Sequence, residues 1–421
     1  MGNSGMTRHR ATLAVVLAGV SAALHVGKLP PAVPALQAGL GINLVEAGFL
    51  LSVVQIAGMS LGLAVGLTAD TLGLRRCMLF GLTLLTATSA VGAAVQPGPL
   101  ALPLLLTLRA LEGVGFLFAA MPGPALIRRL APIGAEKFAL GLWSAYMPLG
   151  VTLALLAGPL LIGWADWSGW WGLLSLLSAL ACFGLVAWVP RDQHALRGVC
   201  APMPWAVRLR ETWGARGPRV LALGFAVYAS QWIAVIGFLP TIYAQAGVSA
   251  GGMAVLTAGA AAMNIAGNLV GGRLLQSGVA PPRLLRWGFA AMALGTLAAF
   301  AQWRLGAQVW QLPAAGRYIA VCVFSLCGGM VPATLIMLTV RLAPSPAVVS
   351  TTVGLVQHAS SFGQFAAPPL VAWLARQAGG WHWTWTVTGA LSLVGIAVAM
   401  HVSALLGDAA YSFSSSTDSQ P

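Results

Sequence analysis

Two pairs of polar or ionisable residues lie within long apolar segments, at spacings that place each pair on one helix face. Arg109 and Glu112 are three residues apart in "LRALEGVG", and His25 and Lys28 are three apart just before "LPPAVPAL". Side chains at this spacing are neighbours on a helix. A charge inside a segment long enough to cross a membrane is costly unless paired, and it marks a functional candidate. Glu112 is therefore expected to take and release a proton, while Arg109 tunes its proton affinity or contacts a substrate.

His25 and Lys28 are predicted to line a substrate cavity together with Arg109. Structural alternatives remain open for both pairs. Arg109 and Glu112 can form an ion pair that only stabilises the fold, and Lys28 can extend its ammonium group to the membrane surface. A single histidine on an apolar helix is more often hydrogen-bonded in the core than bound to a ligand.

The later part of the chain carries further polar groups inside apolar runs. The candidates for substrate binding are Gln231, Trp232, Asn264, Asn268 and His358. Taken singly, each is best explained by a hydrogen bond between helices, worth about 0.6 kcal/mol on average. Taken together, they are predicted to line a polar, aromatic cavity. Because cations outnumber carboxylates inside the apolar runs, the expected solute is an anionic or metal-chelating organic molecule.

Composition determines the fold class that must position these residues. The chain has 421 residues, of which 58% are hydrophobic and 7% are charged, whereas soluble domains are about a quarter charged. Apolar windows of about 20 residues, the length that crosses a bilayer, begin near Ala11, Leu44, Cys77, Pro99, Phe138, Trp170, Val220, Ala250, Leu284, Ala314, Ala347 and Trp385. The windows are too long for barrel strands, which have about 10 alternating residues. We predict an all-α integral membrane protein with twelve transmembrane helices.

The positive charge is distributed by topology. The formal net charge is +13, and most basic residues fall in connections that share one side of the predicted membrane. The positive-inside rule then places both termini in the cytoplasm. We expect a multi-pass protein of the bacterial inner membrane. A nucleic-acid partner is not expected, and the five scattered cysteines predict neither a disulfide framework nor a metal site. The first apolar run lacks a convincing cleavage site, so we interpret it as an uncleaved span.

A polar interval divides the predicted spans six and six. We predict an N-terminal six-helix bundle at 1–189, a cytoplasmic linker at 190–218, a C-terminal bundle at 219–406 and a disordered tail at 407–421. Within the linker, "WAVRLRETW" has the pattern of a short helix on the membrane surface. A shift of 206 residues places Pro34 on Pro240, which supports a repeated unit whose halves enclose a cavity at mid-membrane. The tryptophan clusters "DWSGWW" and "GWHWTW" are interpreted as interfacial belts without a substrate role.

The segment "GLTADTLGLRR" forms the predicted cytoplasmic turn between spans two and three. Gly66 and Gly73 permit a tight turn, Asp70 can cap a helix or pair with an arginine, and Arg75 and Arg76 lie at the inner membrane face. One interpretation is a well-capped loop with no further role. The alternative is a gate in which an ion pair of Asp70 forms in one conformation and breaks in another.

The pattern G-x-x-x-D-x-x-G-x-R-R in this turn resembles the signature loop of the major facilitator superfamily. In span four, Arg109, Gly113 and Gly115 are similar to that superfamily's R-x-x-x-G-x-G signature. The resemblance implies two six-helix bundles that alternate in opening a central site to either side of the membrane. In the second half, Gln276 stands where a repeated loop would carry Asp, so the expected inner gate is asymmetric.

Span five resembles the corresponding span of proton-driven exporters in this superfamily. Gly158, Pro159 and Gly163 follow the exporters' pattern, although Ala145 and Ala154 replace glycines and Ile162 replaces the glycine before the last position. The resemblance implies export of a drug-like or siderophore-like compound by proton antiport. An alternative comes from "GKLPPAVPALQ", which is similar to permeases grouped with cyanate and nitroimidazole carriers and implies uptake of a small organic anion.

Other functional classes fit the sequence less well. A membrane enzyme needs clustered catalytic groups, and acidic residues are scarce here. A receptor would usually carry a soluble signalling domain, for which the polar interval is too short. We expect a monomeric transporter of a small molecule in the lipid bilayer, with no cofactor besides the proton gradient and no metal.

Overall fold

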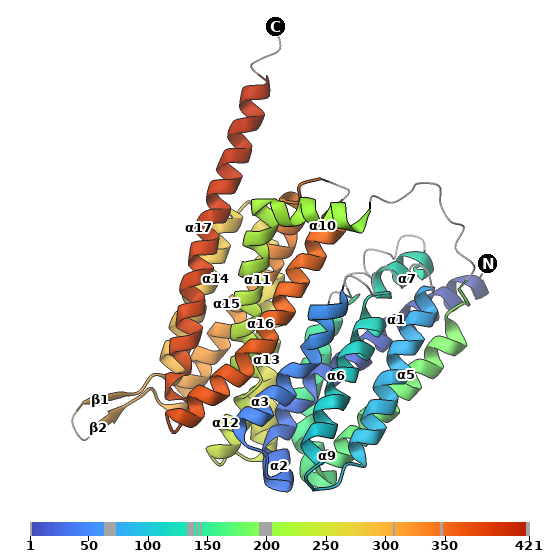
Figure 1. Cartoon of the computed structure of the whole chain (residues 1–421), viewed down its shortest axis with the longest axis vertical. Coiled ribbons are helices and arrows are strands. Elements are labelled where there is room, and N and C mark those ends of the chain that lie inside the picture. The colour runs from blue at the N-terminus through green and yellow to red at the C-terminus, as the bar shows by residue number, and fades with distance from the viewer. Residues whose placement is uncertain are drawn as a thin grey trace. The chain divides into compact units, whose positions relative to one another are not determined.

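The computed structural model describes residues 2–62, 73–132, 139, 142–143, 145–192, 204–305, 308–345 and 348–417. Helices make up most of this part of the chain (Figure 1). The helices and turns before the linker are α1 (Gly2–Gly27), α2 (Leu29–Leu40), α3 (Leu44–Ser52), the 3-10 turn η1 (Val53–Gln55), α5 (Leu74–Ala93), α6 (Ala101–Ala120), α7 (Gly123–Leu130) and α9 (Tyr146–Trp188).

The elements after the linker complete the described chain. They are α10 (Trp205–Gly214), α11 (Arg216–Ile236), α12 (Leu239–Gln245), α13 (Ala250–Gln276), α14 (Pro281–Phe300), β1 (Trp303–Leu305), β2 (Gln308–Trp310), α15 (Ala314–Arg341), α16 (Val349–Gln377), the 3-10 turn η3 (Trp381–Trp383) and α17 (Thr384–Thr417). Helix α10 coincides with the short linker helix expected from the sequence.

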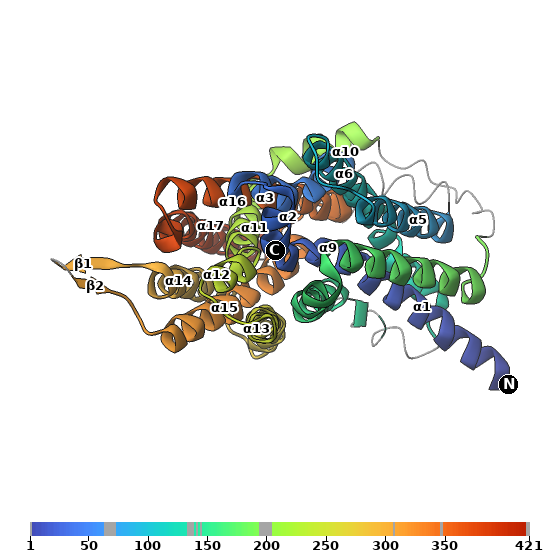
Figure 2. The ribbon, with the colours of Figure 1, turned by 90° about the horizontal axis from the view of Figure 1, so that it is seen from below.

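Helix α9 contains two membrane crossings. Its 43 residues are interrupted at Asp166, whose φ of 58° and ψ of 177° are not helical. The two arms run side by side, because Val151 before the break lies against Gly27 of α1, and Ser178 after the break hydrogen-bonds to His25 of α1. Helix α1 lies along α9 (Figure 2).

The predicted twelve crossings are confirmed. In the described part of the chain, nine helical segments are long and apolar enough to cross a membrane, with α9 counted once. The second arm of α9, together with α14 and α16, brings the total to twelve. One small departure from an all-α fold is the antiparallel hairpin of β1 and β2, in which Trp303 pairs with Trp310. The hairpin extends away from α14 and α15 in both views (Figures 1 and 2).

The chain forms two compact units whose boundaries do not follow the predicted bundles. Unit 1 comprises Met1–Ala201, Ile233–Ala262 and Phe365–Arg376, and unit 2 comprises the remainder. Within unit 1, α12 packs against α2, and Gly48 of α3 approaches Pro369 of α16. Short ends of second-half helices are therefore grouped with the first half. The sequence boundaries at 190 and 218 stay a prediction.

The C-terminal segment differs from its prediction. Helix α17 continues to Thr417, so residues 407–417 are helical where the low-complexity composition predicted a disordered tail. Residues 418–421 lie outside the described residues. Helix continuation through this segment has a simple local reason, because it contains neither proline nor a glycine after Gly407.

Small residues hold the helices of unit 1 close together. A Cβ atom added at Gly81 of α5 would lie 2.5 Å from the carbonyl oxygen of Gly115 in α6, and one added at Gly150 of α9 would lie 2.5 Å from Cβ of Ala23 in α1. Such contacts allow backbones to approach within membranes, where lipid provides no hydrophobic driving force between helices. This close packing leaves the polar side chains of α1, α5, α6 and α9 within reach of one another.

Candidate functional site

The site begins at the break between α1 and α2. Proline has no backbone N–H, so Pro30, Pro31 and Pro34 remove donors from the helical ladder at this point. Helix α1 ends at Gly27 and α2 starts at Leu29. Carbonyl groups at the end of a helix lack partners within the helix and accept hydrogen bonds from elsewhere. The break therefore offers backbone acceptors deep inside the protein, beside His25 and Lys28.

The side chain of Arg109 donates to one of these backbone acceptors and also to a carbonyl oxygen of α3. Its Nη1 donates to the carbonyl oxygen of His25 at 2.8 Å, and its Nε donates to that of Leu50 at 3.2 Å. Leu50 lies just before the 3-10 turn η1, which interrupts the regular helix. The approach depends on Gly113, one turn after Arg109, because a Cβ there would lie 2.2 Å from the carbonyl oxygen of Val54.

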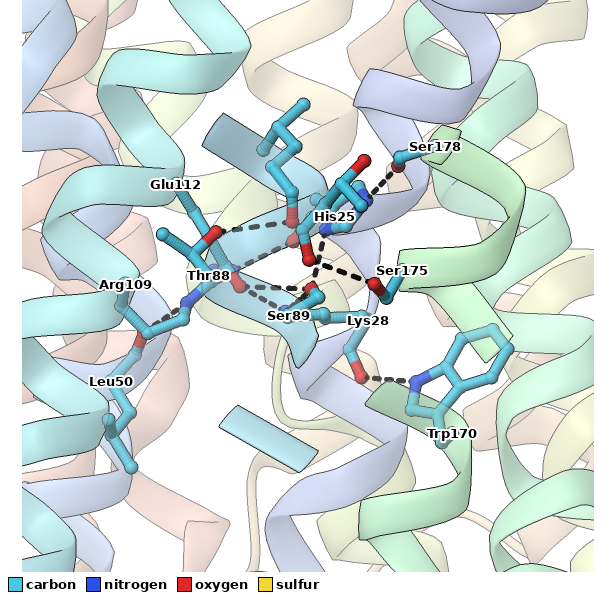
Figure 3. A network of polar contacts seen from close by, with 12 residues as sticks. His25, Lys28, Leu50, Thr88, Ser89, Arg109, Glu112, Trp170, Ser175 and Ser178 are labelled. Carbon is cyan, nitrogen blue, oxygen red and sulfur yellow. Dashed lines mark hydrogen bonds and ion pairs between the residues drawn. The ribbon is translucent and has the colours of Figure 1, made fainter. Parts of the chain in front are cut away.

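Three ionisable side chains form a continuous ion-pair network (Figure 3). Oε2 of Glu112 accepts from Nη1 of Arg109 at 2.6 Å, and Oε1 of Glu112 accepts from Nζ of Lys28. All three side chains are buried, with Lys28 at 0% and Glu112 at 1% exposure. The i, i+3 pair of Arg109 and Glu112 lies as the sequence predicted, and Lys28 joins it from the break between α1 and α2.

His25 connects this network to the second arm of α9. Its Nδ1 lies 3.1 Å from Oγ of Ser89, and its Nε2 lies 2.6 Å from Oγ of Ser178. Ser89 also accepts from Nζ of Lys28 at 2.8 Å and lies 3.3 Å from Oε1 of Glu112. Ser178 is 3.2 Å from Oγ of Ser21. His25 and Lys28, predicted as cavity residues, are thus buried members of the same network as Arg109 and Glu112.

Two tryptophans enclose the lysine. Nε1 of Trp170 donates to the carbonyl oxygen of Lys28 at 3.0 Å, and Nζ of Lys28 lies 4.6 Å from the ring centroid of Trp171. Both indoles are 1% exposed. The prediction of an interfacial belt for "DWSGWW" is therefore wrong for these two residues. A cation over an indole face is stabilised by about 0.5–2 kcal/mol, more when desolvated.

The network carries more positive than negative charge. Lys28 and Arg109 are two cations against the single carboxylate of Glu112, and Nη2 of Arg109 is buried without a hydrogen-bond partner. An uncompensated buried charge costs several kcal/mol. A site of this kind can hold a proton in one state and lose it in another, because deprotonation removes the excess charge.

The predicted polar residues of the second half form separate contacts. Asn264 is joined to Tyr228 by a hydrogen bond of 3.0 Å and donates to the carbonyl oxygen of Ser325 at 3.2 Å; Nδ2 of Asn268 donates to the carbonyl oxygen of Asn264 at 3.0 Å. Gln231 accepts from Oγ of Ser392 at 2.7 Å. These interhelical and local bonds agree with the structural alternative for each residue.

Two other candidates of the second half have no part in those bonds. Nε1 of Trp232 is buried without a hydrogen-bond partner, and His358 on α16 is exposed. The described hydrogen bonds do not bring His358 together with Trp232, Gln231 or Asn264. A shared cavity of these residues stays a prediction.

Contacts of a similar kind occur in the two halves. The 206-residue shift places Gln231 on His25, and each residue bonds to a serine, although those serines, Ser392 and Ser178, are 214 residues apart. Gly329 of α15 lies 216 residues after Gly113, and a Cβ at either glycine would lie 2.2 Å from a carbonyl oxygen of a neighbouring segment. No single shift relates all of these positions, so the internal repeat stays a prediction.

The predicted gate lies partly outside the described residues, which include neither Gly66 nor Asp70. Gly73 has φ of 101°, a conformation that favours glycine. The first N–H groups of α5, those of Arg75 and Arg76, donate to the carboxylate of Asp192 at 3.1 and 3.0 Å. Asp192 is thus a helix cap supplied from 116 residues away, and sequence reasoning gave it no role.

The side chain of Arg75, one of the two predicted gate arginines, contacts the end of α9. The guanidinium of Arg75 donates to the carbonyl oxygen of Val186 at 3.1 Å, close to the end of α9. This bond and the Asp192 cap fasten the start of α5 to the end of α9. Gly73 stands at the N-cap position of α5 and has no side chain to accept from these N–H groups. This was the one sign in the sequence that a carboxylate from elsewhere in the chain caps the helix.

The span-five motif has one packing role that the geometry shows. A Cβ at Gly158 would lie 2.5 Å from Cγ of Pro31, so this glycine lets α9 approach α2. Pro159 is inside the helix, and the space around Gly163 is open within 4 Å.

Sequence reasoning missed four residues of the network and its surroundings, namely Ser89, Ser178, Trp170 and Trp171. Serines and tryptophans in apolar runs carry no pattern that is specific to a site.

Comparison with known proteins identifies the type of molecule. The family model described as Major Facilitator Superfamily matches residues 12–215 and 220–409. The puromycin resistance protein of Streptomyces alboniger is 30% identical over 206 residues, which are 48% of this chain and 38% of that protein. This chain thus aligns with well under two thirds of that relative's length.

Solved structures of two transporters have a similar fold. A bacterial homologue of the human lysosomal transporter Spinster, inward-facing and unoccupied, superposes with a TM-score of 0.71 at 15% identity and covers 94% of each chain. A mutant of the nucleoside transporter NupG gives a TM-score of 0.73 at 12% identity, covering 93% of this chain and 99% of the other. At these identities the likeness concerns the fold alone.

Proposed function

Because the chain belongs to the major facilitator superfamily, we propose that it exports a small drug-like or siderophore-like compound in exchange for protons. Membership of this family makes it a multi-pass membrane transporter of a small solute, and not an enzyme. The direction of transport, the coupling ion and the class of solute are the parts that we propose. Alternating access of two helical bundles is the proposed mechanism.

The observation that carries the proposal is the buried network of Lys28, Glu112 and Arg109. Ionisable groups inside a membrane protein usually belong to an ion or proton pathway. Here the network is 0–1% exposed, contains one excess positive charge, and reaches α1, α5, α6 and α9 through hydrogen bonds. A change in its protonation alters contacts among four helices at once, which is what coupling to a conformational change requires.

Two further observations favour export. One is the similarity over 206 residues to a protein named for puromycin resistance. The other is the Gly158-Pro159 pair of the span-five pattern, whose glycine lies against Pro31 of the α1–α2 break. The break in turn carries His25 and Lys28. Gly158 of the exporter motif therefore lies close to the helix break that holds Lys28 of the ionisable network.

A specific observation also favours the alternative, uptake of a small organic anion. The excess positive charge of the network and the unpartnered Nη2 of Arg109 would attract a carboxylate or a similar group. The segment "GKLPPAVPALQ" at the break agrees with that interpretation. The two functions predict opposite responses to the direction of a pH gradient.

The direction of the gradient gives a clear test. Purified protein is reconstituted in liposomes, and the uptake of puromycin, a hydroxamate siderophore or cyanate is measured. Accumulation driven by an acidic interior supports antiport and export, whereas accumulation driven by an acidic exterior supports uptake by symport. Because puromycin is a weak base that gathers passively in an acidic interior, rates are compared with protein-free liposomes. Transport that ignores the gradient in both directions contradicts proton coupling.

We propose further that the protein is a monomer of the inner membrane with both termini in the cytoplasm, and that Asp70 forms part of an inner gate. The distribution of basic residues supports the orientation. Reporter fusions at the C-terminus, active only in the cytoplasm or only in the periplasm, test the orientation. Light scattering of the detergent-solubilised protein tests the oligomeric state.

A further inference from the structure

We infer that Lys28, and not Glu112, takes and releases the coupling proton, and that a hydrogen-bonded chain beginning at Ser89 conducts it along α1. The inference rests on the proposed proton coupling and names the group that performs it. Three observations support it: the charge balance of the network, the position of Ser89, and the continuity of hydrogen bonds from Lys28 to Ser21.

The charge balance separates the two candidate carriers. If Glu112 took up a proton, Lys28 and Arg109 would remain as two buried cations with no counter-charge. If Lys28 loses its proton, the remaining pair of Arg109 and Glu112, joined at 2.6 Å, is neutral. Buried charges are tolerated when they are paired, and an unpaired one is strongly destabilising. Loss of a proton from Lys28 changes the excess charge of the network from +1 to 0, whereas uptake of a proton by Glu112 changes it from +1 to +2. The first change is therefore the less costly one.

Every charged or titratable group around Lys28 agrees with this assignment. Lys28 contacts Glu112 of α6, which is also bonded to Arg109, and it lies three residues after His25 in the last turn of α1. The facing elements contribute neutral groups, Ser89 of α5 and the Trp171 ring of α9. Glu112 is the one acidic side chain in described contact with Lys28.

Ser89 allows Lys28 to exist in either state without an unpaired polar atom. When Lys28 is an ammonium group, its Nζ donates to Oγ of Ser89 at 2.8 Å, and the single hydroxyl hydrogen of Ser89 is donated either to Oε1 of Glu112 at 3.3 Å or to Nδ1 of His25 at 3.1 Å. When Lys28 is neutral, its lone pair accepts from the same hydroxyl after the O–H turns. The neutral amine still donates to Glu112. A hydroxyl is the group suited to this exchange, because it is both donor and acceptor and its hydrogen rotates freely.

The chain of hydrogen bonds continues from Ser89 without a gap (Figure 3). His25 lies 3.1 Å from Ser89 through Nδ1 and 2.6 Å from Ser178 through Nε2, and Ser178 lies 3.2 Å from Ser21. Each member can accept one proton and release another. Ser21 lies one turn before His25, so the chain leads toward the N-terminal end of α1.

A single proton leaves Lys28 in balanced steps. One N–H proton of Lys28 passes to Oγ of Ser89 as the hydroxyl proton of Ser89 passes to Nδ1 of His25. The Nε2 proton of His25 passes to Oγ of Ser178, whose own proton passes to Oγ of Ser21. Ser21, which is 6% exposed, in turn releases its hydroxyl proton to solvent. Lys28 ends as a neutral amine, and the imidazole ends with its hydrogen on Nδ1. The starting tautomer returns when Lys28 takes up a proton along the same chain in the reverse direction.

Lysine labelling tests the carrier directly, because Lys28 and Lys137 are the two lysines of the chain. Lysine enriched with magnetic isotopes at Cε and Nζ is incorporated into the full chain in lipid nanodiscs, and Lys137→Arg identifies the Lys28 signal. As pH rises, we expect the Lys28 signal to move from the ammonium to the amine position. The side-chain carboxyl signal of Glu112, assigned with Glu112→Asp, should stay that of a carboxylate.

The opposite pattern overturns the inference. If Lys28 remains an ammonium group over the whole pH range in which the protein is folded, it does not release the proton. A simultaneous change of the Glu112 signal would assign that role to Glu112. Because this measurement needs no substrate, it is independent of the transport test. Gradient-driven transport with a Lys28 that never titrates refutes only this inference, and gradient-independent transport refutes the proposed function.

The conducting chain is tested by kinetics with a matched control. Proton release after an alkaline pH jump is timed with an indicator dye, and the part due to Lys28 is the part lost in Lys28→Arg, since arginine keeps its proton. Ser178→Ala should slow that release about tenfold, equivalent to about 1.4 kcal/mol in the barrier. Ser175→Ala, one turn away and bonded to the carbonyl oxygen of Thr86, should not. Equal rates in Ser178→Ala and wild type would exclude the chain.

Discussion

Replacing Glu112 by glutamine tests the charge balance through stability. The variant leaves Lys28 and Arg109 buried at 0% and 1% exposure with no carboxylate between them. Breaking a buried ion pair by removing one partner costs about 3–5 kcal/mol. With about 2 °C of melting temperature for each kcal/mol in a large chain, the expected loss is about 6–10 °C. Thermal unfolding in lipid nanodiscs, followed by tryptophan fluorescence, gives the measurement.

Lys28→Met is the matched comparison for Glu112→Gln. Methionine has a similar length and no charge, so the remaining pair of Arg109 and Glu112 is neutral and still bonded at 2.6 Å. The lost contacts are the ion pair to Glu112, the bond to Ser89 and the cation over Trp171. The last two are together worth about 1–3 kcal/mol, and loss of the ion pair leaves no buried charge unpaired, because Glu112 keeps Arg109 as its partner. Glu112→Gln should therefore lower the melting temperature more than Lys28→Met does. Equal losses, or a larger loss in Lys28→Met, would refute the reasoning from charge balance.

Three further substitutions give separate tests. Gly113→Ala places a Cβ 2.2 Å from the carbonyl oxygen of Val54 and should destabilise the protein by about 1–3 kcal/mol, whereas Gly163→Ala, in open space, should change the melting temperature little; similar melting curves for both would contradict the close-packing argument. Asp192→Ala removes the cap of α5 and should cost about 0.5–2 kcal/mol, measured by the same unfolding assay and contradicted by an unchanged stability. Asp70→Asn should slow transport in the liposome assay without lowering the melting temperature, and wild-type rates would exclude Asp70 from the gate.

Hydropathy predicts much of this fold because the bilayer imposes a length on each helix. The windows that begin near Leu44 and Ala250, for example, correspond closely to the starts of α3 and α13. The fold-back of α9 was also implied by two windows, near Phe138 and Trp170, although the helical signal continues across Asp166. Helix α17 was mispredicted near its end, since low complexity describes composition and does not by itself prevent helix formation.

The site was predictable only where its residues are neighbours along the chain. Arg109 and Glu112 are paired by the helical repeat, and that pair was found from the sequence. Lys28 and Glu112 are 84 residues apart, and Ser178 lies 153 residues from His25. These contacts depend on which helix faces are in contact, which is set by glycines and by the proline break rather than by any local pattern. The cap from Asp192 to α5 was missed for the same reason.

The similar contacts of the two halves differ in one electrical respect. A shift of 206 residues places Ala234 on Lys28, and the shift of 216 that places Gly329 on Gly113 puts Ser325 on Arg109 and Gly328 on Glu112. These second-half positions therefore lack the ionisable groups. A membrane voltage acts on charge, at about 2.3 kcal/mol per elementary charge per 100 mV. Movements of the first-half scaffold through the bilayer are thus sensitive to voltage at this site, and equivalent movements at these neutral second-half positions are not.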